Sequence, residues 1–454
     1  MFTRAEIRQS TKLVLERDDD DDEVQMSKMC NAKSMADFQW ALGLNRLSLR
    51  MIGVWPEANR DHQRHEVSRL RSMRVPFMML WLVLAIVLPQ TYALAQVYRH
   101  LDLVVDNLIT NSAALTSVIK LFLLWKNRYV LEPAIRATED DWSSVSGNDE
   151  TTARNRFELE SMTRQANRAR IFTASGYVIM FGCFAGFVFT PLFGIGIRVV
   201  NNITDPLDGR FFPLQTYYPY DIAPFPLYEL TYASQLLAGS FVGIAFSVPD
   251  NFFGALVFHA CAQCEILNAR LRDILQIGDY CTLDLVEREG ERFHRHLRDF
   301  VRRHVQIIGF VHSIEKSFNV LVLVQVLCLS VVACFLAFGV IQSIRSDDGN
   351  GLAIVQVVTL VATLLNLMIH TFVYCVACEL LAQHSMSFFP TVYNFNWFCL
   401  RAKHSRPVLI VSMRTRHHLK LTAGKFFDLS LHAYMKILKN TAGYISVLLA
   451  VSST

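Results

Sequence analysis

Residues 75 to 98 read VPFMMLWLVLAIVLPQTYALAQVY, a stretch without a single Asp, Glu, Lys or Arg. The hydrocarbon core of a bilayer is about 30 Å thick, and an α-helix needs about 20 apolar residues to cross it. Only a helix or a closed barrel pairs all of its backbone polar groups inside that core. The stretch therefore predicts a membrane-spanning helix.

Further apolar stretches of spanning length follow along the chain. The one at 103 to 125 is the weakest, because it contains Asp106 and Lys120. Of the 454 residues, 52% are hydrophobic, which favours one continuous membrane domain over several soluble ones. We predict an all-α membrane protein with seven transmembrane helices, at 75–98, 103–125, 171–197, 227–260, 317–342, 351–378 and 421–451.

The connections between these stretches differ in their content of Lys and Arg. Alternate segments, beginning with residues 1 to 74, contain 36 of these residues, whereas the other connections contain 4. Cytosolic loops retain basic residues in excess. The count predicts a cytosolic N-terminus and an extracellular C-terminus. The sequon Asn202-Ile203-Thr204 falls in the connection 198–226, which this orientation places outside, and Asn202 is a candidate glycosylation site.

The segment 263–316 has apolar residues at intervals of three and four, typical of amphipathic helices. We interpret them as continuations of the fourth and fifth spans below the membrane. Their apolar stripes pack either against one another or against another subunit. Residues 1–74 are predicted to form a cytosolic N-terminal segment, and residues 75–262 form spans one to four with an extracellular loop at 198–226. Cytosolic anchor segments at 263–316 and 379–420 flank spans five and six at 317–378. The last span covers 421–451.

Two loops have unusual composition. The outer connection is rich in Pro and aromatic residues from Pro206 to Pro226, which predicts an ordered lid rather than a helix. The acidic run from Asp18 to Glu23 is expected to be a solvated tail.

Motifs of catalysis are absent from the sequence, including phosphate-binding loops, nucleophile elbows and metalloprotease helices. We expect no enzyme activity and no cofactor. The pairs Cys261/Cys264 and Cys375/Cys378 have zinc-like spacing, but each lies at an apolar helix end, so we interpret them as packing thiols and expect no metal. A net charge of +4 without a basic face argues against nucleic acid as a partner.

The last 80 or so residues contain a dense set of motifs. They read Glu379-Leu380-Leu381, then Tyr393 to Trp397, then Arg406-Pro407-Val408-Leu409-Ile410, and finally LKLTAGKFFDLSLHAYMKILKNTAGYISVLLAV from Leu419 to Val451. This order resembles the C-terminal signature of the insect odorant receptors. Chain length, span number and orientation suit the same family. One departure is Thr441-Ala442-Gly443, where tuning subunits usually have a Ser-Tyr-Ser-type run.

The resemblance implies a subunit of an odorant-gated, non-selective cation channel. In that family a tuning subunit binds a small volatile odorant and joins a co-receptor in a heterotetramer, in the plasma membrane of the olfactory neuron dendrite. The final helix lines the pore, the cytosolic ends of the later spans form a shared anchor below the membrane, and membrane lipid surrounds the spans.

The last span has a polar lower half and an apolar upper half on one helical face. Polar groups at membrane depth favour contact with water, and a ring of valines can close a path by dewetting. By resemblance, Val447 and Val451 fall on the gate positions, although they can equally be packing residues. The face comprises Asp428, His432, Lys436, Asn440, Gly443, Val447 and Val451.

The resemblance also places the odorant site among the outer halves of spans two, three, four and six. Such sites are concave and mostly apolar, with a few polar groups. The candidates are Asn107, Asn111, Phe184, Phe187, Thr190, Tyr228, Tyr232, Gln235 and Val358.

The sequence fits three other classes of protein less well. A G-protein-coupled receptor needs the opposite topology and an N-P-x-x-Y motif. A gustatory-type channel is nearer, but its closing helix ends in a different motif from Leu449-Ala450. A transporter is disfavoured because no inverted repeat is visible.

Overall fold

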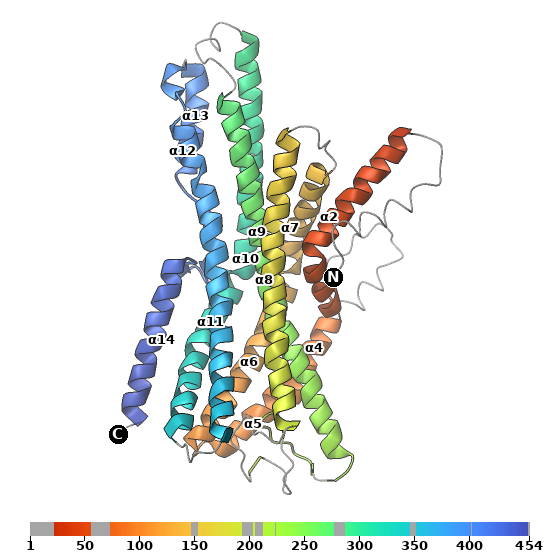
Figure 1. Ribbon diagram of the computed structural model, residues 1–454, viewed down its shortest axis with the longest axis vertical. Helices are drawn as coiled ribbons and strands as arrows, with labels where there is room; N and C mark the ends of the chain where they lie inside the picture. Colours follow the sequence, from red (N-terminus) through yellow and green to blue (C-terminus); the bar gives the residue numbers. More distant parts are fainter. Residues whose placement is uncertain are drawn as a thin grey trace.

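The computed structural model describes residues 22–55, 73–146, 153–192, 203–204, 212–222, 224–276, 287–345, 351–400 and 402–452. Most of the described residues are helical, and the sheet among them is a single two-stranded hairpin. Figure 1 shows long helices running side by side, with the C-terminal helix α14 at one edge of the bundle.

Within the described ranges, six helices are long and apolar enough to cross a membrane. The first is interrupted by a short π-helix before Pro89, which has no backbone N–H to give to the preceding turn. The all-α, multi-span prediction is thereby confirmed. The six are α4 (Arg74–Leu82) with η2 (Val83–Val87) and α5 (Leu88–Val97), α6 (Leu101–Lys126), α8 (Ala153–Leu192), α9 (Leu227–Gln276), α10 (Glu287–Arg345) and α11 (Gly351–Met386).

The last of the seven predicted spans begins later than expected. Residues 421 to 430 are not helical: β1 (Thr422–Ala423) pairs antiparallel with β2 (Phe427–Asp428), and α14 (Leu431–Ser452) follows. Gly424 and Lys425 make the turn with positive φ angles of 59° and 64°, a conformation that glycine adopts readily and other residues rarely do. α14 is not among the six helices above, so the seventh span stays a prediction.

Long helices carry the bundle well beyond the length that a bilayer requires. α9 and α10 contain 50 and 59 residues, so the described parts of 263–316 continue the helices of spans four and five. That these continuations form a cytosolic anchor stays a prediction. Within the described residues, α9 ends at Gln276 and α10 begins at Glu287. Beside them lie α12 (Phe388–Tyr393), the 3-10 helix η3 (Trp397–Cys399) and α13 (Ala402–Thr415), at the top of Figure 1.

Two further helices lie outside the predicted spans. α2 (Asp22–Ile52) takes up much of the N-terminal segment, and α7 (Arg128–Ser146) much of the connection after span two. Phe38 and Trp142, both 2% exposed, belong to one apolar cluster with Phe258 of α9. The end of the acidic run, Asp22 and Glu23, opens α2, while Asp18 to Asp21 lie outside the described residues.

Candidate functional site

The outer loop between α8 and α9 folds back into the bundle at the end that the charge count places outside. Leu214, Gln215 and Thr216 are buried to 6% exposure or less. The amide of Tyr217 donates to the carbonyl of Pro89, at 3.1 Å. Because Pro89 has no N–H, it cannot pair with the carbonyl of Ala85, and the hydroxyl of Tyr218 donates to that carbonyl at 3.4 Å. The proline of α5 thus helps to seat the loop.

Gln235 of α9 holds this loop from the other side. Its Oε1 accepts a hydrogen bond from the amide of Leu214 at 3.3 Å, and its Nε2 donates to Thr216 Oγ1 at 2.8 Å and to Tyr218 Oη at 3.1 Å. The side chain is fully buried. A buried amide is stable only when it is hydrogen-bonded, and here the loop supplies the partners.

Asn107 of α6 contacts the same loop. Its Nδ2 donates to the carbonyl of Gln90 at 3.0 Å and to that of Gln215 at 3.3 Å. Four buried amide atoms in this cluster have no protein partner: Gln90 Oε1, Asn107 Oδ1, and both Oε1 and Nε2 of Gln215. Buried polar atoms of this kind are usually satisfied by water or ligand. The cluster can therefore accept hydrogen bonds from a small hydroxylic molecule and donate one.

Aromatic side chains border the amide cluster. The ring of Tyr228 stacks on Phe212 with centroids 5.1 Å apart and lies 6.1 Å from the ring of Tyr232. Asn111 donates to Thr91 Oγ1 at 3.2 Å. The structure therefore brings Asn107, Gln235, Tyr228 and Tyr232 around one loop.

The remaining candidates for the odorant site lie on α8 and α11. Phe184 of α8 packs so that a Cβ on Gly239 of α9 would lie 3.5 Å from its ring. Val358 of α11 is 61% exposed in the isolated chain and does not join the buried cluster. Phe187 and Thr190 belong to α8, and their side chains lie outside the described set, as does Asn202.

The pore candidates lie on one face of α14. Ala433, Ile437 and Thr441 are buried at 9% exposure or less against the bundle, while Lys436, Asn440 and Val447 are exposed in the isolated chain. Gly443 lies on the same open face, and Val451 belongs to α14 without a described side chain. Asp428 does not belong to this face, because it lies in β2 and its carboxylate pairs with Lys420 at 2.5 Å.

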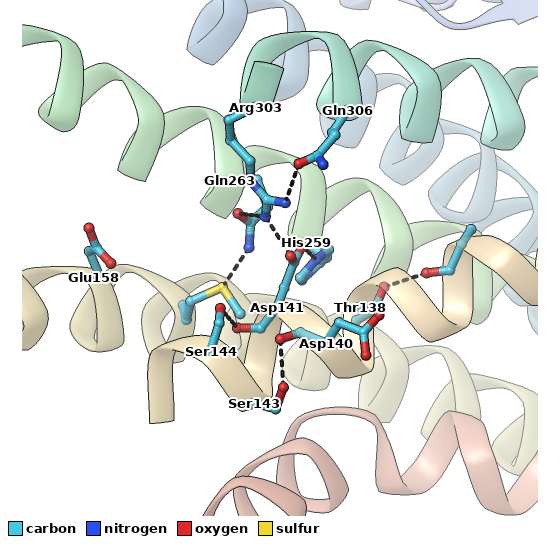
Figure 2. A network of polar contacts seen from close by, with 12 residues as sticks. Thr138, Asp140, Asp141, Ser143, Ser144, Glu158, His259, Gln263, Arg303 and Gln306 are labelled. Carbon is cyan, nitrogen blue, oxygen red and sulfur yellow. Dashed lines mark hydrogen bonds and ion pairs between the residues drawn. The ribbon is translucent and has the colours of Figure 1, made fainter. Parts of the chain in front are cut away.

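A polar network that the sequence did not reveal joins the helices at the other end of the bundle (Figure 2). Asp141 of α7 accepts a 2.5 Å hydrogen bond from Arg303 of α10, and His259 Nε2 of α9 lies 3.0 Å from its second oxygen. Arg303 also donates to Gln263 at 2.7 Å. Burial raises the pKa of Asp141, but His259 and Arg303 outweigh burial and hold that pKa below its usual value.

A cavity of about 350 Å³ lies beside this network, with Arg270 and Arg303 in its wall. Arg270 makes two 2.7 Å hydrogen bonds to Glu158, and Arg303 pairs with Asp141. Since both guanidinium groups already have carboxylate partners, the network ties α7, α8, α9 and α10 together.

These features define a multi-pass, all-α membrane protein with a loop-covered polar site at one end and a helical extension at the other. A family model described as 7tm Odorant receptor matches residues 100–442. The chain belongs to the insect odorant receptor family, which confirms the resemblance of the C-terminal motifs. It is a family of receptors and not of enzymes.

Individual relatives are distant. Odorant receptor 13a and putative odorant receptor 85e of Drosophila melanogaster are 22% and 25% identical, over 53% of this chain in each case, and the matches span only 57% and 58% of those receptors. Odorant receptor 46a, isoform A, of the same species is 22% identical over 89% of this chain and 96% of its own length.

Solved structures share the fold. The olfactory receptor OR5 of the insect Machilis hrabei superposes with a TM-score of 0.72 at 15% identity, over 92% of this chain and 99% of that one. Its complex with eugenol gives a TM-score of 0.69 at 16% identity, with the same coverage.

Proposed function

We propose that this chain is the odorant-binding subunit of a ligand-gated, non-selective cation channel that it forms with the olfactory co-receptor. The observation that supports the proposal best is the position of α14. One face of this helix packs on the bundle through Ala433, Ile437 and Thr441, and the adjacent face, with Lys436, Asn440 and Val447, is left open. A spanning helix with polar groups on its open face is suited to line water.

The odorant binds, in this proposal, beneath the outer loop and among the outer halves of α6, α8, α9 and α11. Asn107 and Gln235 contribute amide groups, and Tyr228 and Tyr232 contribute aromatic faces. The unpartnered side-chain oxygens of Gln90 and Asn107 and the side-chain amide of Gln215 remain to pair with a ligand hydroxyl. A mostly apolar site with a few polar groups suits a small volatile. Asn111, Phe184, Phe187, Thr190 and Val358 complete the proposed lining.

The gate belongs to the outer half of α14, where Val447 is 64% exposed in the isolated chain. In a heterotetramer, Val447 and Val451 of this chain would meet the residues at the same level of the other subunits around the axis and exclude water when close together. Lys436 and Asn440 then face a wider, hydrated vestibule. The N-terminus is cytosolic and the protein resides in the plasma membrane of the olfactory neuron dendrite.

The test is voltage-clamp recording from oocytes that express the chain alone, the co-receptor alone, or both, with an odorant panel. Eugenol belongs in the panel because the OR5 structure of the same fold was solved with it. We expect odorant-evoked cation current only from the pair, with surface biotinylation confirming that the chain reaches the membrane in each case. Equal current from the chain alone would favour a homomeric, gustatory-type channel, and current abolished by G-protein inhibitors would overturn the proposal.

A further inference from the structure

A lysine and an aspartate are buried together among three spanning helices. Lys120 of α6 places its Nζ 2.7 Å and 2.9 Å from the two carboxylate oxygens of Asp250 of α9, and 3.3 Å from the carbonyl of Phe246. The ammonium also lies 3.8 Å from the centre of the Phe246 ring. The side chains of Lys120 and Asp250 are 0% and 1% exposed.

The same carboxylate reaches a third helix. Tyr374 of α11 donates its hydroxyl to Asp250 Oδ1 at 2.6 Å, and His370 Nδ1, one helical turn away, lies 3.5 Å from Oδ2. Tyr374 is 1% exposed and packs on Phe253 of α9 with ring centroids 4.8 Å apart. Asp250 therefore joins α6, α9 and α11 at one point.

The opposite face of that part of α11 contacts α14. The ring of Phe372 lies 5.3 Å from the ring of Tyr434, and the Tyr434 hydroxyl donates to the carbonyl of Met368 at 3.4 Å. His370 and Tyr374 alternate along α11 with Met368 and Phe372. A displacement of α11 relative to Asp250 thus reaches Tyr434 within one or two turns of helix.

Stability alone is a poor reason for this arrangement. Removing two charges from water is expensive, and replacement of a buried ion pair by apolar residues of similar volume is often neutral or stabilising. Ionisable residues inside spanning helices are rare and commonly functional. The pair also joins α6 and α9, on which Asn107 and Gln235 of the proposed odorant site lie, to α11, which contacts the proposed pore helix.

We propose that Lys120, Asp250 and Tyr374 are positioning residues that transmit odorant binding to α14. Displacement of α6 and α9 by a bound odorant moves Asp250, Asp250 moves α11 through Tyr374, and α11 moves Tyr434. This inference rests on the proposed function. One measurement separates this role from a packing role: the odorant current divided by the number of receptors at the cell surface. Breaking the contacts among Lys120, Asp250 and Tyr374 should lower this ratio, whereas loss of packing alone would lower only the number of receptors.

The first test is Tyr374→Phe, which removes one hydroxyl and keeps the ring. Co-expressed with the co-receptor, this variant should reach the surface normally and give a saturating odorant current per surface receptor lower by roughly five-fold or more, within the usual range of coupling between sites. The matched control is Tyr177→Phe. That substitution removes the 2.6 Å hydrogen bond to Ser48 of α2 and the interaction with Asn251 of α9, keeps the hydrogen bonds among Lys120, Asp250 and Tyr374, and should leave the current per surface receptor unchanged.

The second test separates charge pairing from folding. Lys120→Met or Asp250→Leu alone should reduce surface density, because each leaves one buried charge without its partner. The double variant K120M/D250L should restore surface density and still show reduced current per surface receptor. The inference would be overturned if the double variant, or Tyr374→Phe, gave the same current per surface receptor as the unsubstituted chain. Either result would leave the proposed function intact. Absence of odorant-evoked current from the unsubstituted chain co-expressed with the co-receptor, at normal surface density, would overturn both.

Discussion

The amide nitrogen of Gly424 donates a 2.8 Å hydrogen bond to the carbonyl of Asn319, which ties the hairpin before α14 to α10. Glu315, one turn earlier on α10, accepts hydrogen bonds from the amide of Thr422, at 2.8 Å, and from its hydroxyl. A Cβ added to Gly424 would overlap Leu323 of the same helix. The hairpin thus sits against α10 where only glycine fits, which accounts for Gly424 in the A-G-K-F-F stretch.

Gly424→Ala should lower the stability of the protein. The φ angle of 59° alone costs a residue with a side chain about 1–2 kcal/mol, and the overlap with Leu323 adds to this cost. Thermal unfolding of the purified protein in detergent should show a lower Tm. The control is Gly309→Ala on α10, where nothing lies within 4 Å of an added Cβ. Alanine is favoured over glycine within a helix by about 1 kcal/mol, so equal Tm changes in the two variants would refute the explanation.

This hairpin is also where prediction from the sequence failed. Residues 421 to 451 look like one apolar helix, because Leu421, Ala423, Phe426 and Phe427 fit a spanning pattern. The single warning was Gly424, since glycine near the end of a helical pattern often marks a break. What fixes the break is its contact with Glu315 and Asn319, more than 100 residues earlier in the chain, which periodicity cannot reveal.

The other spans could be predicted because, unlike the hairpin, they do not depend on contacts with distant parts of the chain. Membrane helices must satisfy their own backbone and expose apolar side chains, so their signal is local. Lys120 could be recognised as out of place in its span, but not as the partner of Asp250, 130 residues later. The loop contacts of Asn107 and Gln235 likewise depend on how the loop folds back. The sequence supplied the polar candidates and could not supply their partners.

Asp141→Asn should destabilise the network of Figure 2. The substitution removes the charge that pairs with Arg303, whose side chain is 30% exposed, so solvent screening limits the expected loss to about 1 kcal/mol. Asp140→Asn changes the exposed neighbouring carboxylate and should have no effect on Tm at neutral pH.

The pH dependence of the Asp141→Asn effect has a defined sign. The pKa of Asp141 is lowered in the folded state, so its contribution is present above the ordinary carboxyl pKa and disappears as the pH falls through the lowered value. The Tm difference between the unsubstituted protein and Asp141→Asn should shrink in strongly acidic solution. A difference that grows on acidification would contradict the ion pair.

Gln235→Leu should release the outer loop from α9. The variant leaves the amide of Leu214 and the hydroxyl of Thr216 buried without their partner, at a cost of about 1–3 kcal/mol. We expect the odorant concentration for half-maximal current to rise by roughly tenfold, an energy of about 1.4 kcal/mol. Ser240→Ala is the control, because the Ser240 hydroxyl bonds to Leu236 within α9. An unchanged dose response in both variants would separate the loop from ligand binding.

Asn202→Gln tests the orientation of the chain. If the loop at 198–226 is extracellular, the unsubstituted protein carries a glycan, and treatment with an amidase that removes N-linked glycans shifts its gel mobility. The variant should migrate at the shifted position before treatment. Lack of a glycan in the unsubstituted protein, combined with antibody labelling of this loop only after permeabilisation, would reverse the proposed topology.

Val447→Cys tests whether the open face of α14 meets water in the pore. Val447 is 64% exposed in the isolated chain, whereas Ile437, on the adjacent face, is 9% exposed and packs on the bundle. A thiol at Val447 should react with an external, charged methanethiosulfonate reagent when odorant opens the channel, and the added bulk and charge should block the current. Ile437→Cys should not react, and the unsubstituted chain reports any background from Cys183, which is exposed on α8. Block that requires odorant ties Val447 to the open path, because a lipid-facing thiol would be shielded from a charged reagent in every state. Absence of block at Val447 in every state, with surface density unchanged, would instead assign this face of α14 to lipid or to a neighbouring subunit.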